Sequence, residues 1–118
     1  MLIRYKKSFE KIAMGLLSFM PNEKDIKKLQ QTIKQYETDD DWQLYLWKEN
    51  EDIIGLVGIS RIGEQAYEIL HLTVTPSYRN QGIGRAMVKA LKDLYPDASF
   101  TPSKDVAPYY NKIENAGN

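Results

Sequence analysis

Three apolar runs separated by very short polar turns follow one another through the middle of this 118-residue chain. They span Trp42–Lys48, Ile53–Ile62 and Ala66–Thr75, and they contain the β-branched and aromatic residues that favour strands. Connections of only a few residues join neighbouring strands that run in opposite directions, whereas parallel neighbours need a long crossover. The runs therefore predict an antiparallel meander at the centre of the fold.

Two amphipathic helices are expected before the meander. Leu2–Lys6 alternates apolar and polar residues as a short first strand does. Apolar residues then recur at helical spacing from Phe9 to Met20, where Pro21 stops the helix, and a narrower apolar stripe runs from Ile26 to Tyr36.

A crossover unit is expected after the meander. A helix that starts at Gln81 carries a strong apolar stripe as far as Leu94, and residues 98–101 form a short strand. The last helix begins near Asp105, which keeps Pro108 in its first turn. The fourth and fifth strands flank the Gln81 helix and so form a parallel βαβ crossover. The expected fold is one α/β (α+β) domain over residues 1–118, with the order β-α-α-β-β-β-α-β-α and a mixed, mostly antiparallel sheet.

Composition excludes several classes of function. Sixteen basic and sixteen acidic side chains cancel, so no strongly basic nucleic-acid surface is indicated. The chain has no cysteine and one histidine, His71, so a thiolate nucleophile and a Cys- or multi-His metal site are excluded. No apolar run is long enough to span a membrane and no signal peptide is recognised, so we expect a cytoplasmic protein with no membrane partner and no metal.

The stretch from Thr73 to Arg85 carries the chemical signal, because a strand end, a short loop, two glycines and a helix start follow one another there. Unpaired N–H groups and the positive end of the helix dipole meet at such a point and favour a phosphate or pyrophosphate. Gly82 and Gly84 have no side chain to keep a phosphate from the backbone, and Arg79 and Arg85 can add charged hydrogen bonds.

Two common phosphate-binding motifs do not fit this stretch. A P-loop ends in Gly-Lys-Ser/Thr, which is absent. A dinucleotide-binding fold needs a third small residue where Met87 stands, and it opens with a βαβ unit rather than a meander.

The segment Arg79-x-x-Gly82-x-Gly84, after a Val-x-Pro-x-Tyr-Arg strand exit, resembles the acetyl-CoA signature of the GCN5-related N-acetyltransferase (GNAT) superfamily. Residues 54–58 and 67–74 resemble the family's third and fourth strands, and residues 103–113 resemble the helix after its fifth strand. The resemblance covers about two-thirds of the chain, from roughly Trp42 onward, and the two N-terminal helices fit the family's variable substrate-facing part. The whole sequence is also similar to the small acetyltransferase-like proteins of bacterial riboflavin biosynthesis operons.

The resemblance implies a GNAT-like sheet with splayed strands 4 and 5 and acetyl-CoA or coenzyme A as cofactor. The pantetheine arm would pair with the backbone of Leu72 and Val74 between these strands, as an added strand does. Ser103 stands where relatives often have an asparagine that touches the cofactor. The pyrophosphate would bind at the helix start, where the implied contacts are Arg79, Asn80, Gln81, Gly82, Ile83, Gly84 and Arg85.

The resemblance also implies catalytic roles. The N–H of Leu72 would stabilise the oxyanion of a tetrahedral intermediate. Glu68 occupies the place of a glutamate general base at the start of strand 4. Tyr110 matches the tyrosine that protonates the leaving thiolate and touches the cofactor, and Tyr109 competes for that role. His71, expected on the opposite face of its strand from Glu68, is interpreted as a packed neutral imidazole.

The sequence departs from the family pattern at its end, because Glu114-Asn115 stand where Gly-Phe and further strands are usual. We therefore expect a fold shortened at the C-terminus and a homodimer that covers the open sheet edge or completes the cleft. The predicted function is an acetyl-CoA-dependent N-acyltransferase acting on a small primary amine through direct attack in a ternary complex, since no cysteine can form an acyl-enzyme. The alternatives are a catalytically silent CoA-binding module, or a binder of a flavin or of a riboflavin-pathway intermediate.

Overall fold

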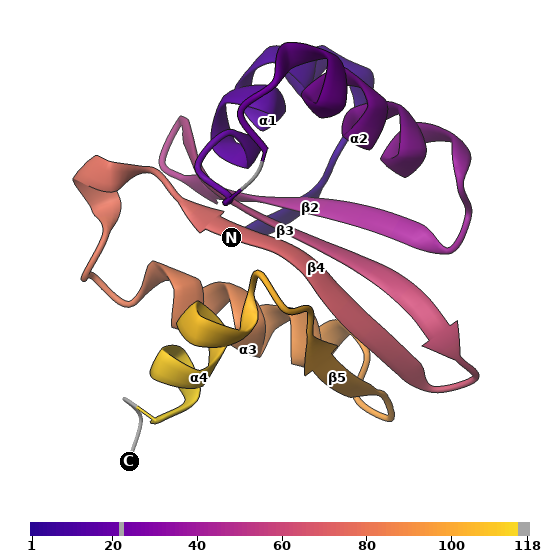
Figure 1. Cartoon of the computed structure of the whole chain (residues 1–118). Helices are drawn as coiled ribbons and strands as arrows, with labels where there is room; N and C mark the ends of the chain where they lie inside the picture. The colour runs from indigo at the N-terminus through magenta and orange to yellow at the C-terminus, as the bar shows by residue number, and fades with distance from the viewer. Residues whose placement is uncertain (22, 116–118) are drawn as a thin grey trace.

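A five-stranded sheet with two helices on each face forms the framework of the protein (Figure 1). The structure is a computed structural model that describes residues 1–21 and 23–115. The sheet has the order β1-β2-β3-β4-β5; the first four strands are antiparallel neighbours, and β5 pairs with β4 in parallel. The strands are β1 (Leu2–Arg4), β2 (Trp42–Glu49), β3 (Asp52–Gly63), β4 (Ala66–Val74) and β5 (Ser99–Pro102).

The helices form around the expected apolar stripes. They are α1 (Glu10–Leu17), α2 (Ile26–Thr38), α3 (Ile83–Leu94) and α4 (Ala107–Asn115), with short 3-10 turns η1 (Lys7–Phe9) and η2 (Pro76–Tyr78). Asp25 caps α2, because its side chain accepts a hydrogen bond of 2.9 Å from the Lys27 N–H. Pro108 lies in the first turn of α4, as predicted.

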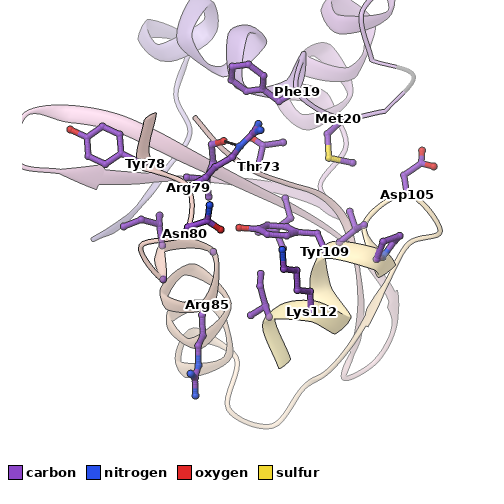
Figure 2. A pocket seen from close by; sticks show the side chains of 18 of the residues that line it. Phe19, Met20, Thr73, Tyr78, Arg79, Asn80, Arg85, Asp105, Tyr109 and Lys112 are labelled. Carbon is purple, nitrogen blue, oxygen red and sulfur yellow. Dashed lines mark hydrogen bonds between the residues drawn. The ribbon is translucent and has the colours of Figure 1, made fainter. Parts of the chain in front are cut away.

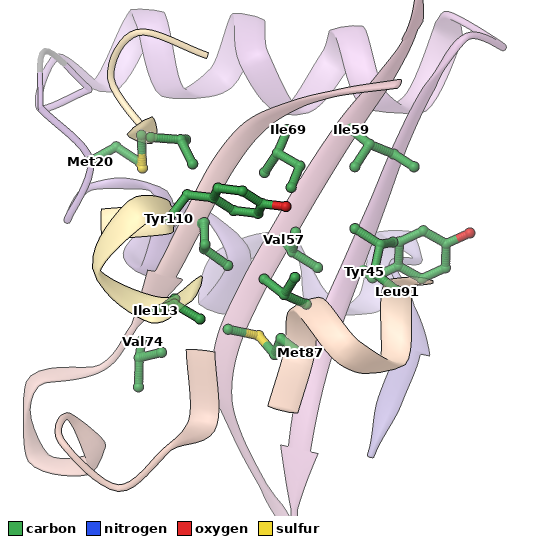
Figure 3. Close-up of a cluster of buried hydrophobic side chains, with 13 residues drawn as sticks. Met20, Tyr45, Val57, Ile59, Ile69, Val74, Met87, Leu91, Tyr110 and Ile113 are labelled. Carbon is green, nitrogen blue, oxygen red and sulfur yellow. The ribbon is translucent and has the colours of Figure 1, made fainter. Parts of the chain in front are cut away.

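Each face of the sheet has its own apolar core. The core on the α1/α2 face consists of Ala13, Leu16, Leu17, Leu29, Ile33, Tyr36, Leu44, Leu46 and Leu56. The larger core lies on the α3/α4 face (Figure 3), and it consists of Met20, Tyr45, Val57, Ile59, Ile69, Leu72, Val74, Met87, Val88, Leu91, Val106, Tyr110 and Ile113. Two separate cores are what a sheet buried on both faces requires.

The predicted element order and the parallel crossover from β4 through α3 to β5 are confirmed. Helix boundaries differ from the prediction, because α1 ends at Leu17 rather than at Met20 and α3 begins at Ile83 rather than at Gln81. Gly82 precedes the helix with φ of +79° and Asn80 has φ of +64°, so the backbone turns through left-handed conformations before the helix can start. Among the described residues, no helix is long and apolar enough to cross a membrane.

A bulge in β4 changes which face two side chains occupy. The register with β3 shifts between His71 and Ile69, which leaves Leu70 as the extra residue. Ile69 packs in the core of the α3/α4 face, so its neighbour Glu68 lies on the α1/α2 face, where His71 also contacts Tyr36. The prediction that Glu68 and His71 lie on opposite faces is therefore wrong, because simple alternation does not hold across a bulge.

Candidate active site

The separation of β5 from β4 leaves the β5 side of β4 unpaired along part of its length. The two strands pair from Ala66 with Ser99 to Ile69 with Pro102, and the Ser103 N–H still donates to the Ile69 carbonyl at 2.9 Å. Beyond that point the chain turns into α4, and no described strand continues along the β5 side of β4. The splay expected of strands 4 and 5 is thus present.

The exposed edge of β4 presents backbone groups to this gap. The Thr75 N–H donates to the Ile54 carbonyl on β3 at 2.9 Å, so Thr75 directs its backbone groups toward β3. Hydrogen-bonding residues alternate along an antiparallel strand, so Val74 and Leu72 direct their N–H and C=O groups toward the open edge. A ligand with amide groups can therefore add to β4 there, in the way that a peptide strand does.

The N-terminus of α3 lies at one end of the gap. Gly82 provides no side-chain cap, and the first helical hydrogen bond recorded there runs from the Ala86 N–H to the Gly82 carbonyl at 3.0 Å. The N–H groups of the first turn consequently have no intrahelical acceptor and combine with the positive end of the helix dipole. This arrangement suits a phosphate group.

A cavity of about 740 Å³ joins the open edge of β4 to this helix start (Figure 2). Three of its charged side chains are cationic, namely Arg79, Arg85 and Lys112, whereas Asp105 is the carboxylate among the described lining residues. The other lining residues are Phe19, Met20, Pro21, Leu72, Thr73, Val74, Tyr78, Asn80, Gly82, Ile83, Gly84, Val106, Pro108, Tyr109 and Ile113.

Arg79 spans two walls of the cavity. Its Nε donates to the Val74 carbonyl at 2.9 Å, and its guanidinium carbon lies 5.3 Å from the centre of the Phe19 ring. The first contact occupies a backbone acceptor on the open edge of β4, and the second is a cation–π contact with the loop between α1 and α2. Arg79 must therefore release Val74 before an added strand can use that carbonyl.

Tyr109 projects from α4 into the cavity, toward the start of α3 (Figure 2). A Cβ on Gly84 would overlap its hydroxyl and lie 3.0 Å from its Cζ, so Gly84 is the residue that permits this approach. Burial raises the pKa of Tyr109, and the charge of Arg79 opposes that shift. The hydroxyl is therefore protonated at neutral pH and can donate a proton.

Eight of the predicted site residues line the cavity together, namely Leu72, Val74, Arg79, Asn80, Gly82, Ile83, Gly84 and Arg85. Four others do not. Glu68 is half-buried on the α1/α2 face of β4, and the Gln81 side chain turns back to the Ser77 carbonyl at 3.4 Å. Ser103 has a buried Oγ with no partner. Tyr110 is 8% exposed and packs in the larger core, so of the two adjacent tyrosines it is Tyr109 that faces the cavity.

Several lining residues were not anticipated as site residues. Phe19, Met20 and Pro21 are more than fifty residues before the glycine loop, and only the tertiary fold brings them to the same cavity. Asp105 and Lys112 lacked a sequence signal, because single charged residues near a helix are usual on any surface. Within residues 1–21 and 23–115, no group of three or more His, Asp or Glu side chains could hold a metal ion.

Comparison with known proteins places these features in a family. The family model for the acetyltransferase (GNAT) family matches residues 10–112. A protein from Bacillus methanolicus described as an uncharacterized N-acetyltransferase in the lysA 3' region is 65% identical over 114 residues, which are 97% of this chain and 95% of that protein.

Two solved structures show the same fold at low sequence identity. An aminoglycoside antibiotic 6'-N-acetyltransferase from Acinetobacter haemolyticus, solved in the apo form, superposes with a TM-score of 0.79 at 11% identity, covering all of this chain and 90% of that one. A GNAT family acetyltransferase from Elizabethkingia anophelis, solved with acetyl-CoA bound, gives a TM-score of 0.70 at 21% identity. The match covers 98% of this chain and 73% of that one.

Proposed function

Because the chain belongs to the acetyltransferase (GNAT) family, we propose that it is an acetyl-CoA-dependent N-acyltransferase that acetylates a primary amine of a small acceptor. The observation that carries the proposal is the open edge of β4 beside the uncapped start of α3, within one cavity. A ligand that combines a pyrophosphate with an amide-containing arm matches both features at once. The acetyl-CoA in the Elizabethkingia anophelis acetyltransferase supports this choice of ligand.

Donor binding uses the two features in sequence along the cavity. The pyrophosphate binds the N–H groups that follow Gly82, where Arg85 adds a charged contact, and the arm pairs with Leu72 and Val74. Arg79 then exchanges the Val74 carbonyl for a phosphate, since the carbonyl is needed by the arm. This geometry directs the thioester carbonyl toward the Leu72 N–H.

The chemistry is direct attack on the thioester. The acceptor nitrogen loses a proton, attacks the carbonyl carbon, and forms a tetrahedral oxyanion that the Leu72 N–H stabilises. An alkylamine is mostly protonated at neutral pH, so a base assists. The family resemblance favours Glu68, which does not line the cavity and would therefore act through water. Collapse of the intermediate releases the CoA thiolate, which takes a proton from a tyrosine; the family resemblance favours Tyr110, and the cavity lining favours Tyr109.

Calorimetric titration with acetyl-CoA and thiol release over a panel of primary amines test the proposal. Gly82→Glu places a carboxylate where the pyrophosphate binds and should abolish both signals. Gly15→Glu is the matched control, because Gly15 lies in α1 and no atom lies within 4 Å of a Cβ added to it, so both signals should stay unchanged. Normal acetyl-CoA binding by Gly82→Glu would refute the proposed donor site.

A catalytically silent CoA-binding module is the second candidate. It is favoured by the positions of Glu68 and Tyr110, neither of which lines the cavity. The two candidates differ in thiol release, which a silent module does not support with any amine. Binding of acetyl-CoA without release, and with no effect of Glu68→Gln or Tyr110→Phe on binding, would favour the module.

Two further properties belong to the proposal. A link to riboflavin biosynthesis rests on sequence resemblance alone, and quenching of flavin fluorescence by the protein would support it, whereas no quenching at high protein concentration would remove it. A homodimer would cover the outer edge of β5, which has no neighbour among the described strands. Light scattering that gives a monomer at working concentration would contradict the dimer.

A further inference from the structure

Three buried polar side chains, which we call the polar cluster, connect α2, β4 and the loop between α1 and α2. The Tyr36 hydroxyl hydrogen-bonds Nδ1 of His71, and Nε2 of His71 lies 3.5 Å from Oε1 of Glu23. His71 is 6% exposed and Glu23 is 9% exposed, so both are largely removed from water. Burying a carboxylate is costly, so the polar cluster needs a specific explanation.

The protonation states of Tyr36 and Glu23 follow from the surroundings of the polar cluster. Burial, together with the charge of Glu23, raises the pKa of Tyr36 well above its usual value, so its hydroxyl keeps its proton. That hydroxyl can then donate to Nδ1 of His71, while Nε2 of the same ring faces Oε1 of Glu23. The hydrogen bond from His71 is the main cause that lowers the pKa of Glu23, which is therefore a carboxylate at neutral pH.

Two backbone features make room for the polar cluster. The bulge at Leu70 brings His71 to the α1/α2 face, and Gly58 on β3 stands opposite His71 in the register. A Cβ on Gly58 would overlap the hydroxyl of Tyr36 and lie 3.0 Å from its Cε1. A glycine in the middle of a central strand weakens that strand, and its presence here is explained by the approach of Tyr36.

Glu23 and Met20 are close in the sequence but pack on different faces of the sheet. Met20 packs in the core of the α3/α4 face, whereas Glu23 is held on the α1/α2 face by His71. The Glu23 N–H donates to the Met20 carbonyl at 3.4 Å. Phe19, Met20 and Pro21 line the same cavity as Leu72, and we call these three residues the Phe19–Pro21 wall.

This wall consists of apolar residues, and Arg79 contacts it through the Phe19 ring, whose centre lies 5.3 Å from the guanidinium carbon. The cationic residues Arg79, Arg85 and Lys112 come from the loop before α3, from α3 and from α4, and none comes from the wall. Resting on the proposed function, we propose that Glu23, held by His71 and Tyr36, is a positioning residue that fixes the Phe19–Pro21 wall against β4 and thereby shapes the acceptor side of the cavity. The acceptor is then an amine whose apolar body packs on that wall.

The test compares Glu23→Ala, which removes the contact, with Glu23→Gln, which keeps an oxygen that can accept from His71. Tyr95→Phe is the matched control, because it breaks the 2.7 Å hydrogen bond between the Tyr45 and Tyr95 hydroxyls, away from the wall. Hydrogen exchange is measured at the backbone amides of the loop between α1 and α2. Acetyl-CoA affinity and the KM for butylamine, benzylamine and tyramine are measured in parallel.

We expect Glu23→Ala to accelerate loop exchange and to raise the amine KM roughly tenfold, since it removes a hydrogen bond to a charged group. The acetyl-CoA affinity of Glu23→Ala should stay within about twofold of that of the unmodified protein. Glu23→Gln should restore most of the loop protection and amine KM, and Tyr95→Phe should change neither loop exchange nor amine KM. Unchanged loop exchange in Glu23→Ala, or an equal change in Tyr95→Phe, would overturn the assignment. Absence of turnover in the unmodified protein would instead contradict the proposed function, and loop exchange would still decide the role of Glu23.

Discussion

Replacing Gly84 by alanine tests whether Tyr109 is held at the start of α3. Gly84 is buried in the first turn of this helix, and an added Cβ would overlap the Tyr109 hydroxyl and lie 2.9 Å from Cδ1 of Ile113. Gly15 in α1 offers the same substitution with nothing within 4 Å of the added atom. The pair separates the general effect of alanine in a helix from the specific effect of displacing Tyr109.

The expected energies follow from these contacts. Alanine is favoured over glycine by about 1 kcal/mol in a helix interior, so Gly15→Ala should stabilise the protein by roughly that amount. At Gly84 the gain is offset by overpacking, which costs about 1–3 kcal/mol. Gly84→Ala should therefore be less stable than Gly15→Ala by about 2 kcal/mol, and its melting temperature should be lower by about 8 °C.

A loss of acetyl-CoA binding should accompany the loss of stability. Moving Tyr109 and adding a methyl group beside the α3 N-terminus should weaken acetyl-CoA binding roughly tenfold, which corresponds to about 1.4 kcal/mol. Thermal unfolding and calorimetric titration of both variants measure the two quantities. If Gly84→Ala is stabilised as much as Gly15→Ala and binds acetyl-CoA with unchanged affinity, then Tyr109 is not held against Gly84 and the reasoning fails.

Three further predictions concern the same cavity and the buried tyrosines. Tyr109→Phe should lower kcat for thiol release about a hundredfold if Tyr109 protonates the thiolate, while a loss confined to Tyr110→Phe would assign that role to Tyr110. Arg79→Gln should weaken acetyl-CoA binding roughly tenfold by calorimetry, because a charged phosphate contact is lost; unchanged affinity would contradict that contact. Burial raises the pKa of Tyr36 and of Tyr109, so above about pH 10 the unfolded chain releases protons that the folded chain keeps. The free energy of unfolding in urea should therefore fall as the pH rises above about 10. An unfolding free energy that stays constant from about pH 9 to 11 would contradict the raised pKa values of these tyrosines.

The order of elements could be predicted because it depends on local pattern. The apolar runs of the meander, the helical stripes and the position of Pro108 all depend on residues that are close in the sequence. The same holds for the end of the cavity that we propose binds phosphate, since Gly82, Gly84 and Arg85 are consecutive with the helix that they begin. Local chemistry thus predicted residues that the structure brings together in one cavity.

The proposed acceptor side could not be predicted in this way. Phe19, Met20 and Pro21 reach the cavity because α1 and α2 pack on one face of the sheet while Met20 packs in the core of the other face. The orientation of Tyr109 relative to Tyr110 depends on how α4 rotates against α3, which adjacent residues on one helix cannot reveal.

Sequence alone determined an α/β domain whose glycine loop, at the end of a strand, is suited to a phosphate, because these properties are set by residues within a few positions of one another. Tertiary structure alone decided the bulge in β4, the burial of His71 between Tyr36 and Glu23, and the wall that faces Leu72. Each of these depends on how well side chains from separate elements fit together, and the free energy of that fit exists only once the chain has folded.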